Sequence, residues 1–300
     1  MMIKICNLTK KFDDFTALDS LNMHVKKGCV YGLVGPNGAG KTTVIKHIAG
    51  VMMQNEGDVF VDDSIVFENI NVKKRIIYIP DDLFFFPSYT IKDMKNFYKS
   101  VYPLWNEERF NHLKDIFNID INRRVQKLSK GMQKQVAFWL GICTMPDVMI
   151  LDEPVDGLDP VMRRKVWSLI LQDVSERNTT VLISSHNLRE LEDVCDHVGI
   201  MHNGRVVLEK QLDDIKSDVH KLQLAFNEKI SDELIAKLNP MHISDFGSIT
   251  LMIVRGDREK LLETANEYSP VICDILPLTL EEIFIYELGG LGYEIKDVIL

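Results

Sequence analysis

The chain has 300 residues, of which 46% are hydrophobic and 26% are charged, a composition typical of a folded globular protein and not of a disordered one. Its 35 basic and 44 acidic side chains give a formal net charge of −9, which argues against broad, nonspecific binding of nucleic acid. The five cysteines are scattered without a C-x-x-C pair, and no apolar run approaches the ~18 residues that span a bilayer. We therefore expect an acidic cytoplasmic protein.

Short apolar runs rich in β-branched residues alternate with helical stretches over about the first 210 residues, which predicts an α/β fold with a mainly parallel sheet. The expected strands occupy residues 29–34, 76–79, 148–151, 180–184 and 198–201. Such uniformly apolar runs suit strands that are buried on both faces. Asn203 and Gly204 then predict a two-residue hairpin turn. An antiparallel strand at residues 205–208 is expected to close this part.

A phosphate-binding pattern, G-x-x-x-x-G-K-[ST], follows the first of these strands and precedes a helical run. In such a loop successive backbone N–H groups converge on phosphate oxygens, and the helix N-terminus adds a partial positive charge. The expected nucleotide contacts are Gly35, Pro36, Asn37, Gly38, Ala39, Gly40, Lys41, Thr42 and Thr43. Lys41 is expected to reach the β- and γ-phosphates, and the Thr42 hydroxyl is expected to ligate Mg²⁺.

The expected strand at residues 148–151 ends in two adjacent carboxylates, Asp152 and Glu153. In a nucleotide hydrolase with a phosphate loop, a carboxylate at this place holds Mg²⁺ directly or through water, which we expect of Asp152. Successive side chains at a strand end point in different directions. Glu153 is therefore the candidate group that orients or deprotonates the attacking water.

A further motif, Leu128-Ser129-Lys130-Gly131-Met132, lies between the phosphate loop and the acidic strand end. With it the chain resembles the ATP-binding subunits of ABC transporters, whose signature is usually L-S-G-G-Q. The resemblance covers about residues 2–215. It implies ATP hydrolysis with ATP and Mg²⁺ as cofactors. The implied fold is an α/β P-loop NTPase core with an antiparallel β subdomain and a helical insertion at about residues 83–145.

The same resemblance assigns residues that bind nucleotide from outside the phosphate loop. Phe12 stands where these ATPases place an aromatic ring against adenine. Ser129 and Gly131 stand where the signature of one subunit binds the γ-phosphate held by another. Asp159, in a segment that resembles the D-loop of the family, is expected to reach across that dimer. The resemblance therefore implies a second cassette as partner, either an identical chain or a paralogue.

Two more positions complete the expected catalytic group. His186 ends the strand at residues 180–184 like the family's switch histidine, which contacts the γ-phosphate, and joins Glu153 and Lys41 as a candidate catalytic residue. Asp81 occupies the position where the family usually carries a glutamine that contacts Mg²⁺ and water. A carboxylate can also ligate Mg²⁺, so Asp81 is a candidate metal ligand together with Thr42 and Asp152.

The pattern changes after about residue 218, where two alternating segments predict half-buried strands. Their apolar residues are Leu222, Leu224 and Phe226 in the first and Ile249, Leu251 and Ile253 in the second. Helices are expected at residues 232–238 and 258–268, opened by Ser231 and Asp257. Another helix should start at Thr279, which forms a capping-box pattern with Glu282. We therefore divide the chain into a nucleotide-binding domain, residues 1–217, and a small α+β module, residues 218–300.

The family resemblance also implies a separate transmembrane permease subunit, which would hold this chain at the inner face of the cell membrane. The 88 positions from Lys41 to Ser129, the Lys-Gly-Met signature and the C-terminal module resemble ATPases of ABC-2-type exporters. Residues 102–110 are similar to cassettes of Gram-positive peptide-antibiotic resistance or stress exporters. The alternative is an ABC ATPase without a membrane partner, acting on ribosomes or nucleic acid; a single cassette and the net charge of −9 disfavour it.

The aromatic run Phe84-Phe85-Phe86 lies just after Asp81, where a permease helix would dock beside the helical insertion. Exposed aromatic side chains often anchor interfaces. The alternative is that these rings form the core of the insertion itself. Burial of all three rings in the folded chain would exclude the docking role.

Overall fold

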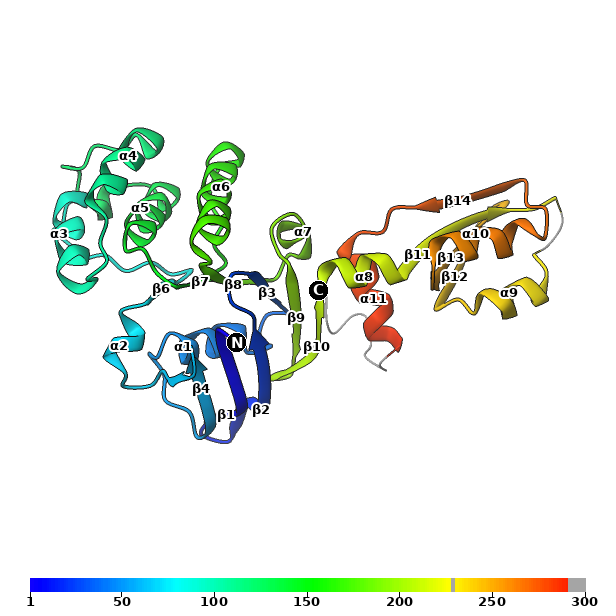
Figure 1. Cartoon of the computed structure of the whole chain (residues 1–300), viewed down its shortest axis with the longest axis horizontal. Helices are drawn as coiled ribbons and strands as arrows, with labels where there is room; N and C mark the ends of the chain where they lie inside the picture. Colours follow the sequence, from blue (N-terminus) through cyan, green and yellow to red (C-terminus); the bar gives the residue numbers. More distant parts are fainter. Residues whose placement is uncertain (228–229, 291–300) are drawn as a thin grey trace. The chain divides into compact units, whose positions relative to one another are not determined.

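The computed structural model describes residues 1–227 and 230–290, which form two compact units (Figure 1). The first unit comprises Met1–Asn187 and Val194–Glu209, and the second comprises Leu188–Asp193 and the chain from Lys210 onward. The final part of the expected C-terminal module, residues 291–300, lies outside the described residues. Among those that are described, no helix has the length and apolar character needed to cross a membrane.

A six-stranded sheet forms the centre of the first unit. Its order is β10-β9-β3-β8-β7-β6, and the pairings from β9 to β6 are all parallel. The strands are β3 (Val30–Val34), β6 (Ile76–Ile79), β7 (Val148–Asp152), β8 (Thr180–Ser185), β9 (His197–His202) and β10 (Arg205–Gln211). The predicted hairpin is present between β9 and β10, where Asn203 and Gly204 both have positive φ, 46° and 74°, as a type I′ turn requires.

The expected antiparallel subdomain is a second sheet of order β2-β1-β4-β5. It consists of β1 (Ile3–Phe12), β2 (Phe15–Val25), β4 (Glu56–Val61) and β5 (Ser64–Ile65). The helix α1 (Lys41–Ile48) contributes Val44, Ile45 and Ile48 to one apolar core that also contains residues of both sheets. This shared core fixes the phosphate loop, which precedes α1, against both sheets. A short helix, α2 (Ile70–Lys73), leads into β6.

The predicted helical insertion lies between the neighbouring strands β6 and β7. It contains α3 (Ile91–Val101), α4 (Glu107–Phe117), the 3₁₀ turn η1 (Val125–Lys127) and α5 (Lys130–Cys143), drawn in cyan and green in Figure 1. Trp139 stacks on Phe110 at a ring-centroid distance of 4.5 Å and donates a hydrogen bond from Nε1 to the Phe110 carbonyl. After β7 the chain forms α6 (Pro160–Arg177) and, beyond β8, α7 (Leu188–Leu191).

The second unit is an α+β module built on an antiparallel sheet of order β12-β13-β11-β14. The elements are α8 (Leu212–Asp218), β11 (Val219–Ala225), α9 (Asp232–Leu238), β12 (His242–Phe246), β13 (Ile249–Arg255), α10 (Arg258–Asn266), β14 (Ile272–Leu276) and α11 (Leu280–Gly290). The expected N-terminal caps are present. Ser231 and Asp257 accept backbone hydrogen bonds at the starts of α9 and α10, and Thr279 and Glu282 form the reciprocal capping box.

The two strands predicted from alternating apolar residues are present as β11 and β13. Leu222 and Leu224 face the apolar core formed with α9 and α10, as expected. On β13, however, the residues in that core are Met252 and Val254, and the register pairs Leu222 with Met252. Ile253 is buried as well, but it does not belong to this core cluster. Because β13 is apolar on both faces, its own alternation does not distinguish them.

Candidate functional site

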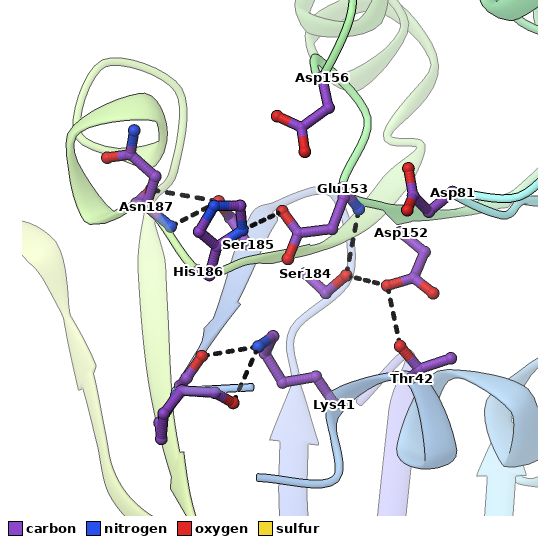
Figure 2. Close-up of polar contacts among 12 residues, drawn as sticks. Lys41, Thr42, Asp81, Asp152, Glu153, Asp156, Ser184, Ser185, His186 and Asn187 are labelled. Carbon is purple, nitrogen blue, oxygen red and sulfur yellow. Dashed lines mark hydrogen bonds and ion pairs between the residues drawn. The ribbon is translucent and has the colours of Figure 1, made fainter. Parts of the chain in front are cut away.

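The carboxyl ends of four adjacent parallel strands, β3, β8, β7 and β6, bring the predicted site residues together (Figure 2). Ligands of open α/β sheets bind at this edge. A cleft of about 420 Å³ opens here, which is within the size range of small-molecule sites. The residues that line it are Phe12, Phe15, Ala17, Asn37, Gly38, Gly40, Lys41, Thr42, Thr43, Asp81, Asp152 and Glu153.

The phosphate loop needs glycine for two different reasons. A Cβ at position 35 would lie 2.4 Å from the Met201 carbonyl oxygen of β9, so only glycine fits between loop and sheet. Gly40 precedes α1 with φ of 103°, a backbone conformation that other residues rarely adopt. The chain therefore reverses sharply from β3 into the helix and leaves the N-terminus of α1 beside the cleft.

Lys41, the first residue of α1, is only 7% exposed. Its Nζ donates hydrogen bonds to the carbonyl oxygens of Gly35 at 2.6 Å and Pro36 at 3.2 Å, which holds the side chain folded along the loop (Figure 2). Burial lowers the pKa of Lys41, and the nearby carboxylates of Glu153 and Asp152 act in the opposite sense. The ammonium group is therefore placed between the loop and the acidic strand end.

Thr42 and Asp152 form the arrangement expected of a magnesium site. The Thr42 hydroxyl lies 3.4 Å from Oδ1 of Asp152, and the Ser184 hydroxyl donates a hydrogen bond to the same oxygen (Figure 2). Asp152 is 4% exposed. Its second carboxylate oxygen, Oδ2, takes no part in these two bonds. A hydroxyl and a carboxylate that converge at a cleft are a donor set suited to Mg²⁺.

Glu153 and His186 meet across the ends of the neighbouring strands β7 and β8. His186 Nδ1 lies 3.0 Å from Oε2 of Glu153 (Figure 2). Burial raises the pKa of the Glu153 carboxyl, and the hydrogen bond to His186 opposes that rise. The same hydrogen bond raises the pKa of His186. Asp156 belongs to this charged group as well. One carboxylate oxygen each of Glu153 and Asp156 and one ring nitrogen of His186 all lie within 4.8 Å of one another.

Phe12 lies at the mouth of the cleft with 44% of its surface exposed. Lys10 Nζ lies 5.2 Å from the centre of its ring. Sequence reasoning missed a second ring, Phe15, which pairs with Phe12 across the β1–β2 hairpin and is 64% exposed. The signal that could have identified it is the pair of aromatic residues that flank the two-residue turn Asp13-Asp14. The mouth of the cleft therefore offers two aromatic surfaces.

Asp81 lines the cleft, but its carboxylate faces a residue that sequence reasoning did not identify. Lys134 of α5 lies with Nζ 3.4 Å from Oδ1 of Asp81 and donates to the backbone carbonyls of Glu153 and Asp156. The motif LSKGM ends before this lysine, and nothing in the linear sequence indicates that its side chain returns to the strand ends.

Gly35, Pro36, Ala39 and His186 lie beside the cleft without lining it. Ser129, Gly131 and Asp159 are also absent from its lining and serve locally as structural residues. Ser129 caps α5 by accepting a hydrogen bond from Met132 N, and Asp159 caps α6 by accepting from Val161 N and Met162 N. Gly131 packs against the loop before α6, because a Cβ there would lie 2.6 Å from the Gly157 carbonyl oxygen. The structure thus separates the signature from the phosphate loop.

Comparison with known sequences agrees with this geometry. Residues 18–156 match the family described as ABC transporter. The chain is 31% identical over 289 residues to the ABC transporter ATP-binding protein YtrB of Bacillus subtilis, in an alignment that covers 96% of this chain and 99% of YtrB. The chain belongs to the ABC transporter ATP-binding proteins.

Other ABC proteins extend the comparison. Over 302 residues the chain is 30% identical to the bacitracin transport ATP-binding protein BcrA of Bacillus licheniformis, with coverage of 96% of this chain and 98% of BcrA. A solved structure of an ATP-binding subunit of an ABC transporter superposes with a TM-score of 0.68 and 26% identity, covering 72% of this chain and 92% of that one. This ABC protein is therefore an ATPase with an additional C-terminal unit.

Proposed function

We propose that this chain is the ATP-hydrolysing subunit of an ABC-2-type exporter, which powers a separate membrane permease through ATP-driven association with a second cassette. The full-length similarity to a protein named for bacitracin transport supports the exporter assignment, because it includes the C-terminal unit as well as the cassette. The motif set around the cleft supports nucleotide hydrolysis. A cytoplasmic position beside the inner face of the membrane, through the permease, follows from this proposal.

The residues at the strand ends divide the chemistry among them. Backbone amides of the phosphate loop and the Lys41 ammonium bind the phosphates, and Phe12 stacks against adenine. The Thr42 hydroxyl and the Asp152 carboxylate would hold Mg²⁺, with Asp81 as the third candidate ligand. When bound, Mg²⁺ would neutralise charge on the phosphates.

Glu153 and His186 act on the attacking water and the γ-phosphate. Glu153 is placed to orient the water and accept its proton, and its raised pKa makes it a stronger base than an ordinary carboxylate. His186 holds the Glu153 carboxylate through the 3.0 Å contact and contacts the γ-phosphate from its other ring nitrogen. Both therefore belong to the proposed catalytic group.

The proposed dimer is supported by the separation, within one chain, of the phosphate-loop cleft from the signature and D-loop residues that the family uses to bind nucleotide. The described cleft contains the phosphate loop, the acidic strand end and Asp81, whereas Ser129, Gly131 and Asp159 do not line it. A second cassette would supply its own copies of these residues to the open side of the nucleotide bound here. Ser129, Gly131 and Asp159 of this chain would in turn contact the nucleotide bound to that second cassette. ATP would then join two cassettes through charge-assisted hydrogen bonds, and hydrolysis would release them.

The helical insertion offers a candidate docking surface for the permease. Phe84 is 76% exposed and Phe86 is 37% exposed, whereas Phe85 is buried at 5%. Phe84, Phe86 and Phe97 form edge-to-face pairs at centroid distances of 6.0 and 5.4 Å. The insertion has a core of its own around Trp139 and Phe110. Phe84 is therefore available for a permease helix, in keeping with the docking hypothesis.

Isolation of the full-length chain from its source cells in mild detergent tests this function. The expected result is a complex with a membrane protein of about six apolar helices that stimulates ATP hydrolysis by the chain. A Glu153→Gln chain should form the same complex without turnover. Recovery with ribosomes or nucleic acid in place of a membrane protein would overturn the proposal.

A further inference from the structure

Lys134 is a buried lysine on the second turn of α5, with a side chain only 5% exposed. A buried ammonium group is costly unless each of its donors finds an acceptor. Lys134 Nζ has three acceptors: the Glu153 carbonyl oxygen at 2.6 Å, the Asp156 carbonyl oxygen at 3.1 Å and Oδ1 of Asp81 at 3.4 Å. The three N–H groups of an ammonium are thereby matched.

The three acceptors come from two different loops, one after β6 and one between β7 and α6. Asp81 follows β6, Glu153 follows β7, and Asp156 lies in the loop that leads to α6. Lys134 itself belongs to the helix that begins at the signature. One side chain therefore connects the signature helix to two loops beside the nucleotide cleft, all within the first compact unit.

The contact with Glu153 has a specific consequence for its side chain. Glu153 has φ of 45°, in the left-handed region that a residue other than glycine occupies only when its surroundings hold it there. A hydrogen bond to the Glu153 carbonyl fixes the peptide plane that follows its Cα, while Glu153 N donates to the Ser184 carbonyl oxygen at 3.2 Å. Both peptide groups of the residue are thus held, which fixes the direction of its Cα–Cβ bond, and the carboxylate beyond it contacts His186.

We propose that Lys134 is a positioning residue of the ATPase site, which holds the backbone of Glu153 and compensates the carboxylate of Asp81. The inference rests on the proposed function, in which Glu153 is the catalytic base. It also accounts for an acidic residue where the family usually has glutamine, because a buried cation lies directly against it. Lys134 does not line the cleft at the phosphate loop; it acts through Glu153 and Asp81.

Steady-state kinetics of full-length Lys134→Met and Lys134→Arg chains tests the inference. Misplacement of the base should lower kcat of Lys134→Met by about 10- to 100-fold with little change in KM for ATP. Lys134→Arg, which keeps the charge, should recover a large part of kcat. The exposed Lys114→Met on α4 is the matched control and should leave kcat unchanged. Wild-type kcat in Lys134→Met would overturn the proposal, as would a loss that tracks thermal stability and is not rescued by arginine.

Combination with Asp81→Gln tests the coupling directly. Asp81→Gln alone should keep part of the activity. If the two residues act as a pair, the double variant should be at least about threefold more active than the product of the single effects implies. Effects that simply multiply would contradict the pairing. Glu153→Gln, measured in parallel, separates the two proposals. If Glu153→Gln hydrolyses ATP, Glu153 is not the catalytic base. If Glu153→Gln is inactive and Lys134→Met is fully active, only the positioning role of Lys134 is excluded.

Discussion

His186 Nδ1 lies 3.0 Å from Oε2 of Glu153, across the carboxyl ends of two neighbouring parallel strands. The hydrogen bond and charge of Glu153 raise the pKa of His186, Asp156 acts in the same direction, and Lys41 opposes it. A histidine whose pKa is raised by folding stabilises the protein while it is protonated. This contribution is complete below the unfolded value of about 6.5 and is lost as the pH rises through the higher folded value.

His186→Ala should therefore destabilise the chain more at low pH than at high pH. His186 is half exposed, so we expect a loss of about 0.5–1 kcal/mol below about pH 6.5. The loss should shrink once the pH exceeds the folded pKa of His186. Denaturant unfolding across this range measures the effect, with the exposed His112→Ala as control. A destabilisation that is the same at every pH would contradict the charged pair.

Gly131→Ala should strain the contact between the signature helix and the loop before α6. The new Cβ would lie 2.6 Å from the Gly157 carbonyl oxygen, which is backbone and has little room to move. Overpacking of this kind lowers the free energy of unfolding by about 1–3 kcal/mol. ATP turnover should also fall, because the loop that contains Gly157 would be displaced. Chemical denaturation of Gly131→Ala and of the neighbouring Lys130→Ala provides the comparison. Equal stability of the two variants would show that this packing is not maintained in solution.

Much of the site could be predicted because each of its motifs ends a strand of the parallel sheet. The glycine pattern before Lys41 and the acidic pair Asp152-Glu153 each follow an uninterrupted apolar run. Parallel strands carry all such residues to one edge. The motifs that the sequence pattern places at strand ends therefore meet in the folded sheet. The signature and His186 were identified from the resemblance to ABC proteins.

The remaining features depend on contacts that linear patterns do not encode. Lys134 binds carbonyl groups 19 and 22 positions away, and backbone carbonyls carry no sequence signal. The core face of β13 cannot be predicted from its own sequence, because Met252 and Val254 alternate with residues that are equally apolar. The exposure of Phe84 beside the buried Phe85 depends on how the insertion packs, since the two residues have the same chemistry.

Phe84→Asp should weaken the association of the chain with its permease. A carboxylate in place of an exposed anchor ring would have to be desolvated in the interface. The fraction of chain that sediments with membranes of cells expressing the partner should fall. Phe246→Asp is the matched control, because Phe246 is 65% exposed in the C-terminal unit. Unchanged membrane association of Phe84→Asp would exclude this ring from the docking surface.

The most direct test of the central claim is the behaviour of Glu153→Gln with Mg-ATP. Loss of the base should stop hydrolysis while leaving nucleotide binding intact, so that ATP stays trapped between two cassettes. Light scattering should then show an ATP-dependent increase from the 34.5 kDa of one chain to twice that mass, with no such increase for Lys41→Ala. Hydrolysis of ATP by Glu153→Gln at the wild-type rate would contradict the account.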